Sequence, residues 1–281
     1  MNANSGSPAG PGIIGWILRL VLVGVSVYFI YWAYNKLYEG PASSTVLLKD
    51  IYVGNPEAGK AFTFEKKVIP PLFEGGEYTV SAWVYVNGWA NSNRYQFNKE
   101  ILRIGNPNGN LTLGIYLDYK DNKLHVITGT MPAPTASGSN AVANGLTSAT
   151  YDSLFTNAMP SMQTIGNDCE VSPFALQRWV LVNVALSGKT VDVYIDGKLS
   201  RSCILPDLFR VDTEYNITVG KNGGFSGFIS GLKADAYALN PEEVYRMYMA
   251  GPLGAVGWWE YFKSLFDPKA IGTLDYPKMN L

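Results

Sequence analysis

The sequence predicts an all-β protein: an antiparallel jelly-roll β-sandwich, preceded by one N-terminal transmembrane helix and followed by short C-terminal helices. Aromatic residues make up 13% of the 281 residues and there are 29 glycines, which is typical of many short strands joined by tight turns. About eleven strand-length segments follow residue 46, with no predicted helix between them to make parallel crossovers. A long apolar run comes before them. Antiparallel sheets packed in a sandwich are the natural closure for such strands.

The apolar run from 13 to 34, IIGWILRLVLVGVSVYFIYWAY, is long enough to cross a membrane as a helix. Its 22 residues would span roughly 33 Å at about 1.5 Å per residue. Arg19 lies near one end, where its side chain can reach the membrane surface. We therefore expect a transmembrane helix over 13–38, with these anchoring side chains: Trp16, Arg19, Tyr28, Tyr31, Trp32 and Tyr34. The alternatives are a buried core helix and a cleaved signal sequence, but the uncharged tail at 1–12 lacks the basic region of a signal.

The sequence leaves the membrane orientation open. Five lysines between residues 36 and 67 follow the helix, which by the positive-inside rule places the large domain on the cytosolic side. Two features point the other way. Asn110 and Asn216 begin glycosylation sequons, and Cys169 and Cys203 could form one disulfide or remain as two buried thiols.

The strand-length segments begin after a linker at 39–45 and are rich in β-branched and aromatic residues. They are 46–53, 61–69, 77–86, 100–105, 110–119, 123–128, 179–186, 190–195, 198–204, 215–220 and 226–238. In TVDVYIDGKLSRSC, apolar residues alternate from Val191 to Ile195. Asp196 and Gly197 then supply the positive-φ turn of a hairpin. Asp196 is therefore predicted to be a corner and not a catalyst.

One short helix is predicted where the sandwich ends. Asn240 can cap it, Pro241 suits its first turn, and Glu243 stands at capping-box distance. Gly251 and Pro252 then stop the helix. It should lie across the edge of the sandwich.

Two segments lie outside the strand pattern. Residues 129–168 are predicted to be a long insertion loop, whose uncharged first part is either a disordered excursion or a loop that orders against a partner. The tail at 253–281 contains GAVGWWEYFKSLFDP, an amphipathic helix with Trp258, Trp259 and Phe262 on its apolar face. This helix can lie at the membrane interface or pack on the sandwich.

Three motifs resemble a known family when they are taken in order. WVLVNVALSGKTVDVYIDGKLSRSC resembles the hairpin of laminin-G-like domains in the concanavalin A-like lectin and glucanase superfamily, in which a Trp-led strand precedes Tyr-x-Asp-Gly. EYTVSAWVYVN resembles the early central strand, and NITVGKNGGFSGFISGLKADAYALNPEEVYRMYMAGP resembles the closing segment. The resemblance covers residues 46–252. It implies a jelly roll that binds proteins or glycans, and membrane-anchored examples are similar to minor capsid proteins that link membrane and shell in large DNA virus particles.

Catalytic and metal chemistry find little support in the sequence. Glycoside hydrolases of this superfamily present Glu-x-Asp-x-x-Glu on one strand, and that pattern is absent. His125 is interpreted as a packed or surface residue without a partner, since no nucleophile motif accompanies it. Residues 117–122, LDYKDN, are a candidate calcium loop but fit a solvated hairpin turn better. We predict no enzyme, no cofactor and no metal, and a net charge of −1 gives no footprint for nucleic acid.

Binding through aromatic residues is the better-supported function. In 77–86, the valines alternate with Trp83 and Tyr85, which share the opposite face; Tyr194 and Tyr237 stand similarly on their strands. These four are the candidate partner-binding residues, and the alternative is that loops cover the rings. The prediction is a membrane-anchored recognition or structural protein whose partners are the lipid membrane and a shell or assembly protein. The alternatives are a cell-surface glycan-binding adhesin and a degenerate glycoside hydrolase.

Overall fold

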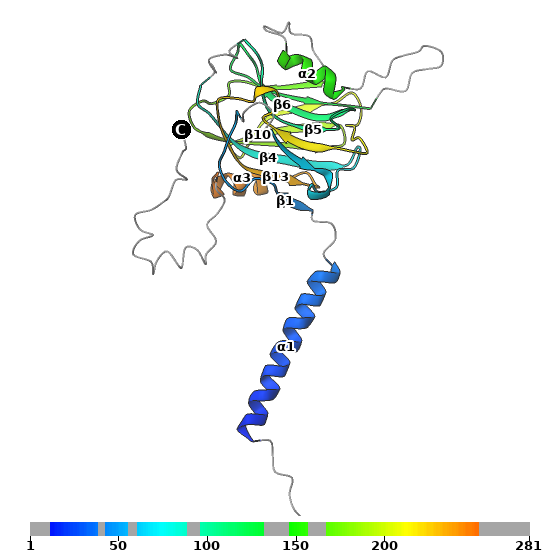
Figure 1. The fold of residues 1–281 in the computed structure, drawn as a ribbon, viewed down its shortest axis with the longest axis vertical. Coiled ribbons are helices and arrows are strands. Elements are labelled where there is room, and N and C mark those ends of the chain that lie inside the picture. Colours follow the sequence, from blue (N-terminus) through cyan, green and yellow to red (C-terminus); the bar gives the residue numbers. More distant parts are fainter. Residues whose placement is uncertain are drawn as a thin grey trace, which may run out of the picture. The chain divides into compact units, whose positions relative to one another are not determined.

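The computed structural model describes residues 12–38, 43–55, 61–88, 96–131, 146–156 and 167–252 (Figure 1). The chain divides into two compact units at Ala42, and each unit is described by itself. The first unit contains α1 (Ile13–Tyr38), and the second contains every strand. The predicted interfacial helix with Trp258, Trp259 and Phe262 lies outside the described residues.

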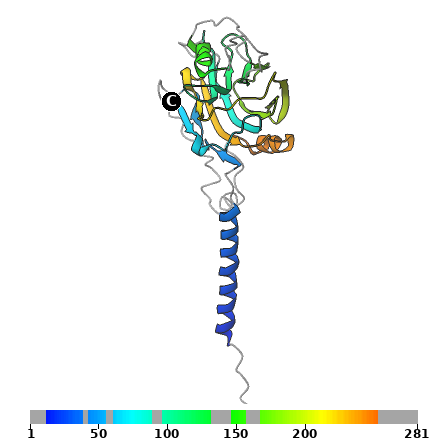
Figure 2. The ribbon, with the colours of Figure 1, turned by 90° about the vertical axis from the view of Figure 1, so that its right-hand side faces the viewer.

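Helix α1 is a single long helix, as Figure 2 shows. Its stretch Gly15–Ala33 has a mean hydropathy of 1.8 and is long and apolar enough to cross a membrane. The same length and composition also fit a signal sequence near the N-terminus. The predicted anchoring side chains are exposed at these positions: Trp16, Arg19, Tyr28, Tyr31 and Trp32. The side chain of Tyr34 lies outside the described part of the helix.

The second unit is an antiparallel β-sandwich, as predicted. The first sheet has the order β1-β13-β4-β9-β10-β11, with β2 beside β13, and the second has the order β3-β12-β5-β6-β7-β8. The strands of the first sheet are β1 (Ser44–Val46), β2 (Tyr52–Val53), β4 (Glu77–Val86), β9 (Trp179–Ser187), β10 (Thr190–Ile195), β11 (Lys198–Ile204) and β13 (Gly227–Asp235). Those of the second are β3 (Phe62–Glu65), β5 (Lys99–Gly105), β6 (Leu111–Leu117), β7 (Leu124–Thr128), β8 (Asn167–Val171) and β12 (Asn216–Val219).

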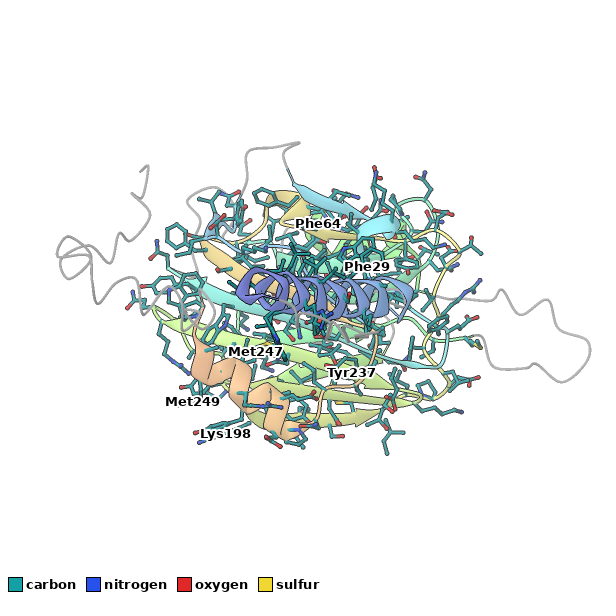
Figure 3. The ribbon with its side chains drawn as sticks, turned by 90° about the horizontal axis from the view of Figure 1, so that it is seen from below. Phe29, Phe64, Lys198, Tyr237, Met247 and Met249 are labelled. Atoms are coloured by element: carbon teal, nitrogen blue, oxygen red, sulfur yellow. A yellow bond between two sulfur atoms is a disulfide. The ribbon has the colours of Figure 1, made fainter. Side chains whose placement is uncertain are left out.

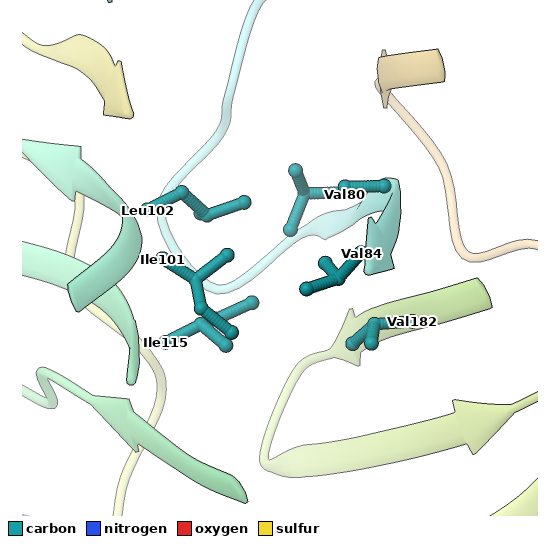
Figure 4. A pocket seen from close by; sticks show the side chains of 7 residues that line it. Val80, Val84, Ile101, Leu102, Ile115 and Val182 are labelled. Carbon is teal, nitrogen blue, oxygen red and sulfur yellow. The ribbon is translucent and has the colours of Figure 1, made fainter. Parts of the chain in front are cut away.

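The hydrophobic core lies between the two sheets. Period-two alternation turns the valines of β4 inward, where they join one large buried cluster. Figure 4 shows side chains of the two sheets meeting in this core: Val80, Val84 and Val182 from the first sheet, and Ile101, Leu102 and Ile115 from the second. Every residue of β4 that is not in this core must therefore face the outer side of the first sheet.

Two predicted elements need correction. The segment 46–53 is not one strand, because β13 shifts register at Gly231 and the N–H groups of Leu47 and Leu48 both donate to the Leu232 carbonyl there. The predicted insertion loop at 129–168 contains helix α2 (Ser148–Thr156), and strand β8 begins at its end, at Asn167. Helix α2 covers the outer face of the second sheet, where it buries Tyr151 and Phe155.

A disulfide joins the edge strands of the two sheets. Cys169 lies in β8 and Cys203 in β11, with 5.9 Å between their Cα atoms. Each strand is the edge strand of its sheet, so the disulfide links the two sheets covalently along one side of the sandwich. The neighbouring hairpin turns at Asp196 and Gly197, both with positive φ, as predicted. The Asp196 carboxylate also accepts a hydrogen bond from the Leu181 N–H at 3.0 Å.

Helix α3 (Pro241–Ala250) begins with the predicted capping box. The Asn240 side chain accepts from the Glu243 N–H at 3.0 Å, and the Glu243 carboxylate accepts from the Asn240 N–H at 3.0 Å. The helix packs on the outer face of the first sheet. Figure 3 shows Met247 on the side of α3 toward the sheet and Met249 on the other side.

Candidate binding surface

Three aromatic side chains form a row across the outer face of the first sheet. Tyr85 lies directly opposite Phe228 of β13 on one side and Trp179 of β9 on the other. The ring centroids are 6.1 Å apart for Tyr85 and Phe228 and 5.6 Å apart for Tyr85 and Trp179. Val53 of β2, opposite Phe228, extends the row and is 49% exposed. We call Phe228, Tyr85 and Trp179 the aromatic row; each ring is half-buried and keeps surface for a ligand.

The four predicted site residues do not form one exposed surface, although Tyr194 and Tyr237 pack in the same cluster. Trp83 is only 5% exposed, because α3 covers it and Tyr248 stacks on its indole at 5.9 Å. Tyr194 is also 5% exposed, packed with Leu239 and Val244. The alternative of covered rings therefore holds for Trp83 and Tyr194, with α3 and not a loop as the cover. The remaining exposed surface of Trp83 lines a pocket beside α3.

Tyr237 and Tyr85 are the two predicted rings that remain half-buried. The Tyr237 hydroxyl donates to Glu243 at 3.5 Å, at the start of α3. Only Tyr85 belongs to the aromatic row. Phe228 and Trp179 were not predicted as site residues, although both stand in the motifs that resemble laminin-G-like domains, because only the strand register makes them neighbours of Tyr85.

The outer side of α3 adds an exposed apolar patch. Tyr245 and Met249 are 49% and 66% exposed, and Leu199 of β11 is 54% exposed. Helix α3 and β11 are in contact. Tyrosine and methionine are enriched at protein interfaces, so this patch has the composition of a contact surface.

A pocket of about 310 Å³ lies on the sheet side of α3. It is lined by Val46, Leu48, Lys49, Trp83, Gly231, Lys233, Met247, Ala250 and Gly251. Gly231 has a positive φ, and a Cβ there would lie 3.1 Å from the Trp83 ring. Most of the lining is apolar, and the two lysines are its charged groups. Lys233 is paired with the buried Asp235 at 2.7 Å.

The other outer face, on the second sheet, holds a buried ion cluster that fastens α2. The Arg103 guanidinium of β5 donates to Glu100 at 2.9 Å and also pairs with Asp152 of α2. Asn222 donates to both carboxylates, at 2.9 and 2.7 Å. Burial raises the pKa of Glu100. Burial alone would raise the pKa of Asp152 as well, but hydrogen bonds from Arg103 and Asn222 lower it. We call Glu100, Arg103, Asp152 and Asn222 the Arg103 cluster.

His125 has partners that the sequence did not reveal. Its Nδ1 atom is 2.8 Å from Asp168 Oδ2, its Nε2 atom is 3.6 Å from Asp118 Oδ2, and Tyr116 stacks on the ring at 4.8 Å. The interpretation of a partnerless histidine was therefore wrong. Burial lowers the pKa of His125, but its interactions with Asp118 and Asp168 outweigh burial and raise that pKa to about 9.

We expect His125 to stabilise the fold below about pH 6.5, its unfolded pKa, and this contribution to disappear as the pH rises through about 9. His125→Gln should therefore cost more stability at about pH 6 than at about pH 9.5, as measured by urea unfolding. Burial lowers the pKa of Lys99 to about 8, which makes stability rise with pH above that value. Because both proteins contain Lys99, the difference between wild type and variant isolates His125. An equal difference at both pH values would contradict the assignment.

Two further groups of candidate residues are placed by the structure. Asp118 Oδ1 accepts from the Lys120 N–H at 2.7 Å, which makes 117–122 a hydrogen-bonded turn. Within the described residues, no group of three or more His, Cys, Asp and Glu side chains could hold a metal ion. Asn110 and Asn216 are half-buried, and Asn110 Nδ2 donates to Asp212 at 3.3 Å. Glycosylation at either sequon stays a prediction.

Comparisons with known proteins found no matching family model and no matching curated protein. Solved structures with similar folds include a botulinum neurotoxin type G receptor binding domain, at 12% identity, a TM-score of 0.42 and 73% coverage of this chain. Another is the binding domain of botulinum neurotoxin DC in complex with SialylT, at 13% identity, a TM-score of 0.41 and 74% coverage. The chain covers 45% and 46% of these two toxin chains. A third is the native heptameric SAP-like pentraxin from Limulus polyphemus, at 12% identity, a TM-score of 0.44, and coverage of 73% of this chain and 84% of that one.

Proposed function

We propose that this chain is a membrane-anchored, non-catalytic recognition protein whose β-sandwich binds a partner protein at the aromatic row. The observation that carries the proposal is the alignment of three half-buried rings on three neighbouring strands. Rings held in this way offer large, rigid apolar area at little entropic cost, which is the chemistry of interface hot spots. The exposed α3 patch of Tyr245, Met249 and Leu199 would supply further contact area.

A non-catalytic role is supported by the ion pairs of four carboxylates. Glu100 and Asp152 share Arg103, and Asp118 and Asp168 share His125. General acid and base catalysis needs one carboxyl group to give up a proton while another accepts one. A cation placed between the members of each pair holds both carboxylates in ion pairs, which suits a structural role and not glycoside hydrolysis.

The anchor and the disulfide support a location for the domain. Helix α1 would span the membrane, with Trp16 at one end and Tyr31 and Trp32 at the other. Disulfides form in oxidising compartments, so the Cys169–Cys203 bond supports placing the sandwich on an oxidising side of that membrane. If the sandwich lies in the lumen of sealed native vesicles, added protease should not cleave it. Detergent treatment should then remove this protection.

A glycan is the second candidate ligand, because Tyr85 and Trp179 can stack on sugar rings and the exposed polar residues Asn87 and Arg178 stand beside them in sequence. The finer proposal of a minor capsid protein linking a virion membrane to its shell rests on the sequence resemblance alone. Purified particles that contain this chain in fixed ratio to a shell protein would support it, and particles without the chain would contradict it.

Tyr85→Ala and Trp179→Ala are each expected to weaken partner binding by about thirtyfold or more, since truncating a central aromatic anchor costs about 2 kcal/mol or more. Phe73→Ala is the matched control, because Phe73 is a 63% exposed ring outside the row. Titration against the partner protein measures the first candidate ligand, and a glycan array measures the second. If the chain binds only glycans, and both row variants lose that binding, then the ligand of the aromatic row is a sugar and not a protein. Unchanged binding of every ligand would contradict the proposed surface.

A further inference from the structure

The pocket beside α3 is a preformed apolar site. Its floor is the Trp83 indole, which is held between the sheet and the Tyr248 ring. Met247 and Ala250 of α3 form one wall, and Val46 of β1 contributes to the lining from the edge of the sheet. Thioether and indole groups favour aromatic ligands, because sulfur and π faces attract aromatic rings.

The described chain ends at this pocket and is fastened there. Gly251 lines the pocket, and its N–H donates to the Tyr248 carbonyl at 3.2 Å. The Pro252 carbonyl accepts from the Ser230 hydroxyl at 2.7 Å, which holds the end of the chain against β13. The sequence that follows Pro252 therefore starts beside the pocket.

The next part of the sequence has the composition that the pocket requires. Residues 253–257, LGAVG, can extend over at most about 18 Å, so Trp258 and Trp259 are within reach of the pocket. These two are followed by Phe262, Leu265 and Phe266. Within this segment Glu260 can pair with Lys49 of the pocket lining, whereas Lys233 is already paired with Asp235.

We propose that the segment 258–266 of this chain is the ligand of the pocket, with an aromatic side chain seated against Trp83 and Met247. The short tether is the physical reason for choosing this occupant, because a linked ligand acts at an effective concentration on the order of millimolar. A contact with a dissociation constant below about 1 mM is then mostly formed. The inference does not depend on the partner-binding function, which uses the aromatic row and the opposite side of α3.

Photo-crosslinking of the full chain in its membrane tests this assignment. Met247→p-benzoyl-phenylalanine places the probe in the pocket lining, and Met249→p-benzoyl-phenylalanine is the matched control on the outer side of the same helix. Mass spectrometry should find an adduct between position 247 and a peptide within 258–266 of the same chain. Its yield should not change on about tenfold dilution, because the reaction is intramolecular. The probe at position 249 should not form this adduct.

Three results would overturn the proposal. They are a position-247 adduct on lipid, an adduct between isotopically light and heavy copies of the chain, and no adduct with the tail peptide.

A second pair of variants checks the aromatic anchors in the background of the 247 probe. Trp258→Ser with Trp259→Ser should lower the adduct yield by about tenfold. Tyr276→Ser, a ring in the same tail but outside the segment, should leave the yield unchanged. Equal yields in both variants would also remove the inference.

Discussion

Replacing Arg103 with methionine is expected to lower the free energy of unfolding by about 3 to 5 kcal/mol, because it leaves the buried Glu100 carboxylate without its counter-ion. The Glu100 side chain is fully buried and the Arg103 side chain is 5% exposed. Asp152 would lose its ion pair with Arg103, which fastens α2 to β5, and would keep Lys221 at 3.3 Å. Urea unfolding of the full chain, followed by tryptophan fluorescence, measures the loss.

Arg246→Met is the matched control for this variant. Arg246 pairs with Glu242 at 3.6 Å on the exposed side of α3, and removing such a pair should change stability by no more than about 1 kcal/mol. A double variant, Arg103→Met with Glu100→Gln, should recover part of the loss, since it removes the unpaired charge. If Arg103→Met were no more destabilising than Arg246→Met, the Arg103 cluster would not hold α2 in place.

Removing the disulfide is expected to lower stability by about 3 to 4 kcal/mol, since it closes a loop with a sequence separation of 34 residues. Cys169→Ala with Cys203→Ala is the suitable variant, because serine at the buried position 169 would add an unsatisfied hydroxyl. Reducing agent should destabilise the wild type by a similar amount and leave the double variant unchanged. Equal unfolding curves for the wild type with and without reductant would contradict the bond.

The sequence predicted the elements whose local pattern agrees with their burial. Strand β4 alternates valines with other residues because one face meets the core, and α3 is marked by its capping box. Strand β8 could not be predicted in this way, because NDCEV contains only two residues that enter the core, Cys169 and Val171. Its ladder with β7 and its disulfide are contacts between distant parts of the chain.

The binding surface was only partly predictable for the same reason. Alternation places Tyr85 on the outer face, but its neighbours depend on the register of three strands that are far apart in sequence. Trp83 shares that face, yet α3 covers its ring. Neither the sequence of β4 nor that of α3 contains a local signal that predicts this contact. Arg103 and Asp152 are 49 residues apart, so their ion pair was also hidden.

Photo-crosslinking from position 85 in native membranes tests the central claim most directly. Tyr85→p-benzoyl-phenylalanine places the probe in the middle of the aromatic row, and the same substitution at Phe73 is the control on another exposed ring. A binding role for the row predicts that one partner protein is joined in fixed ratio at position 85 and not at 73. Adducts that are equally frequent at both positions, or found only on glycans or lipids, would contradict a protein-binding surface at the aromatic row.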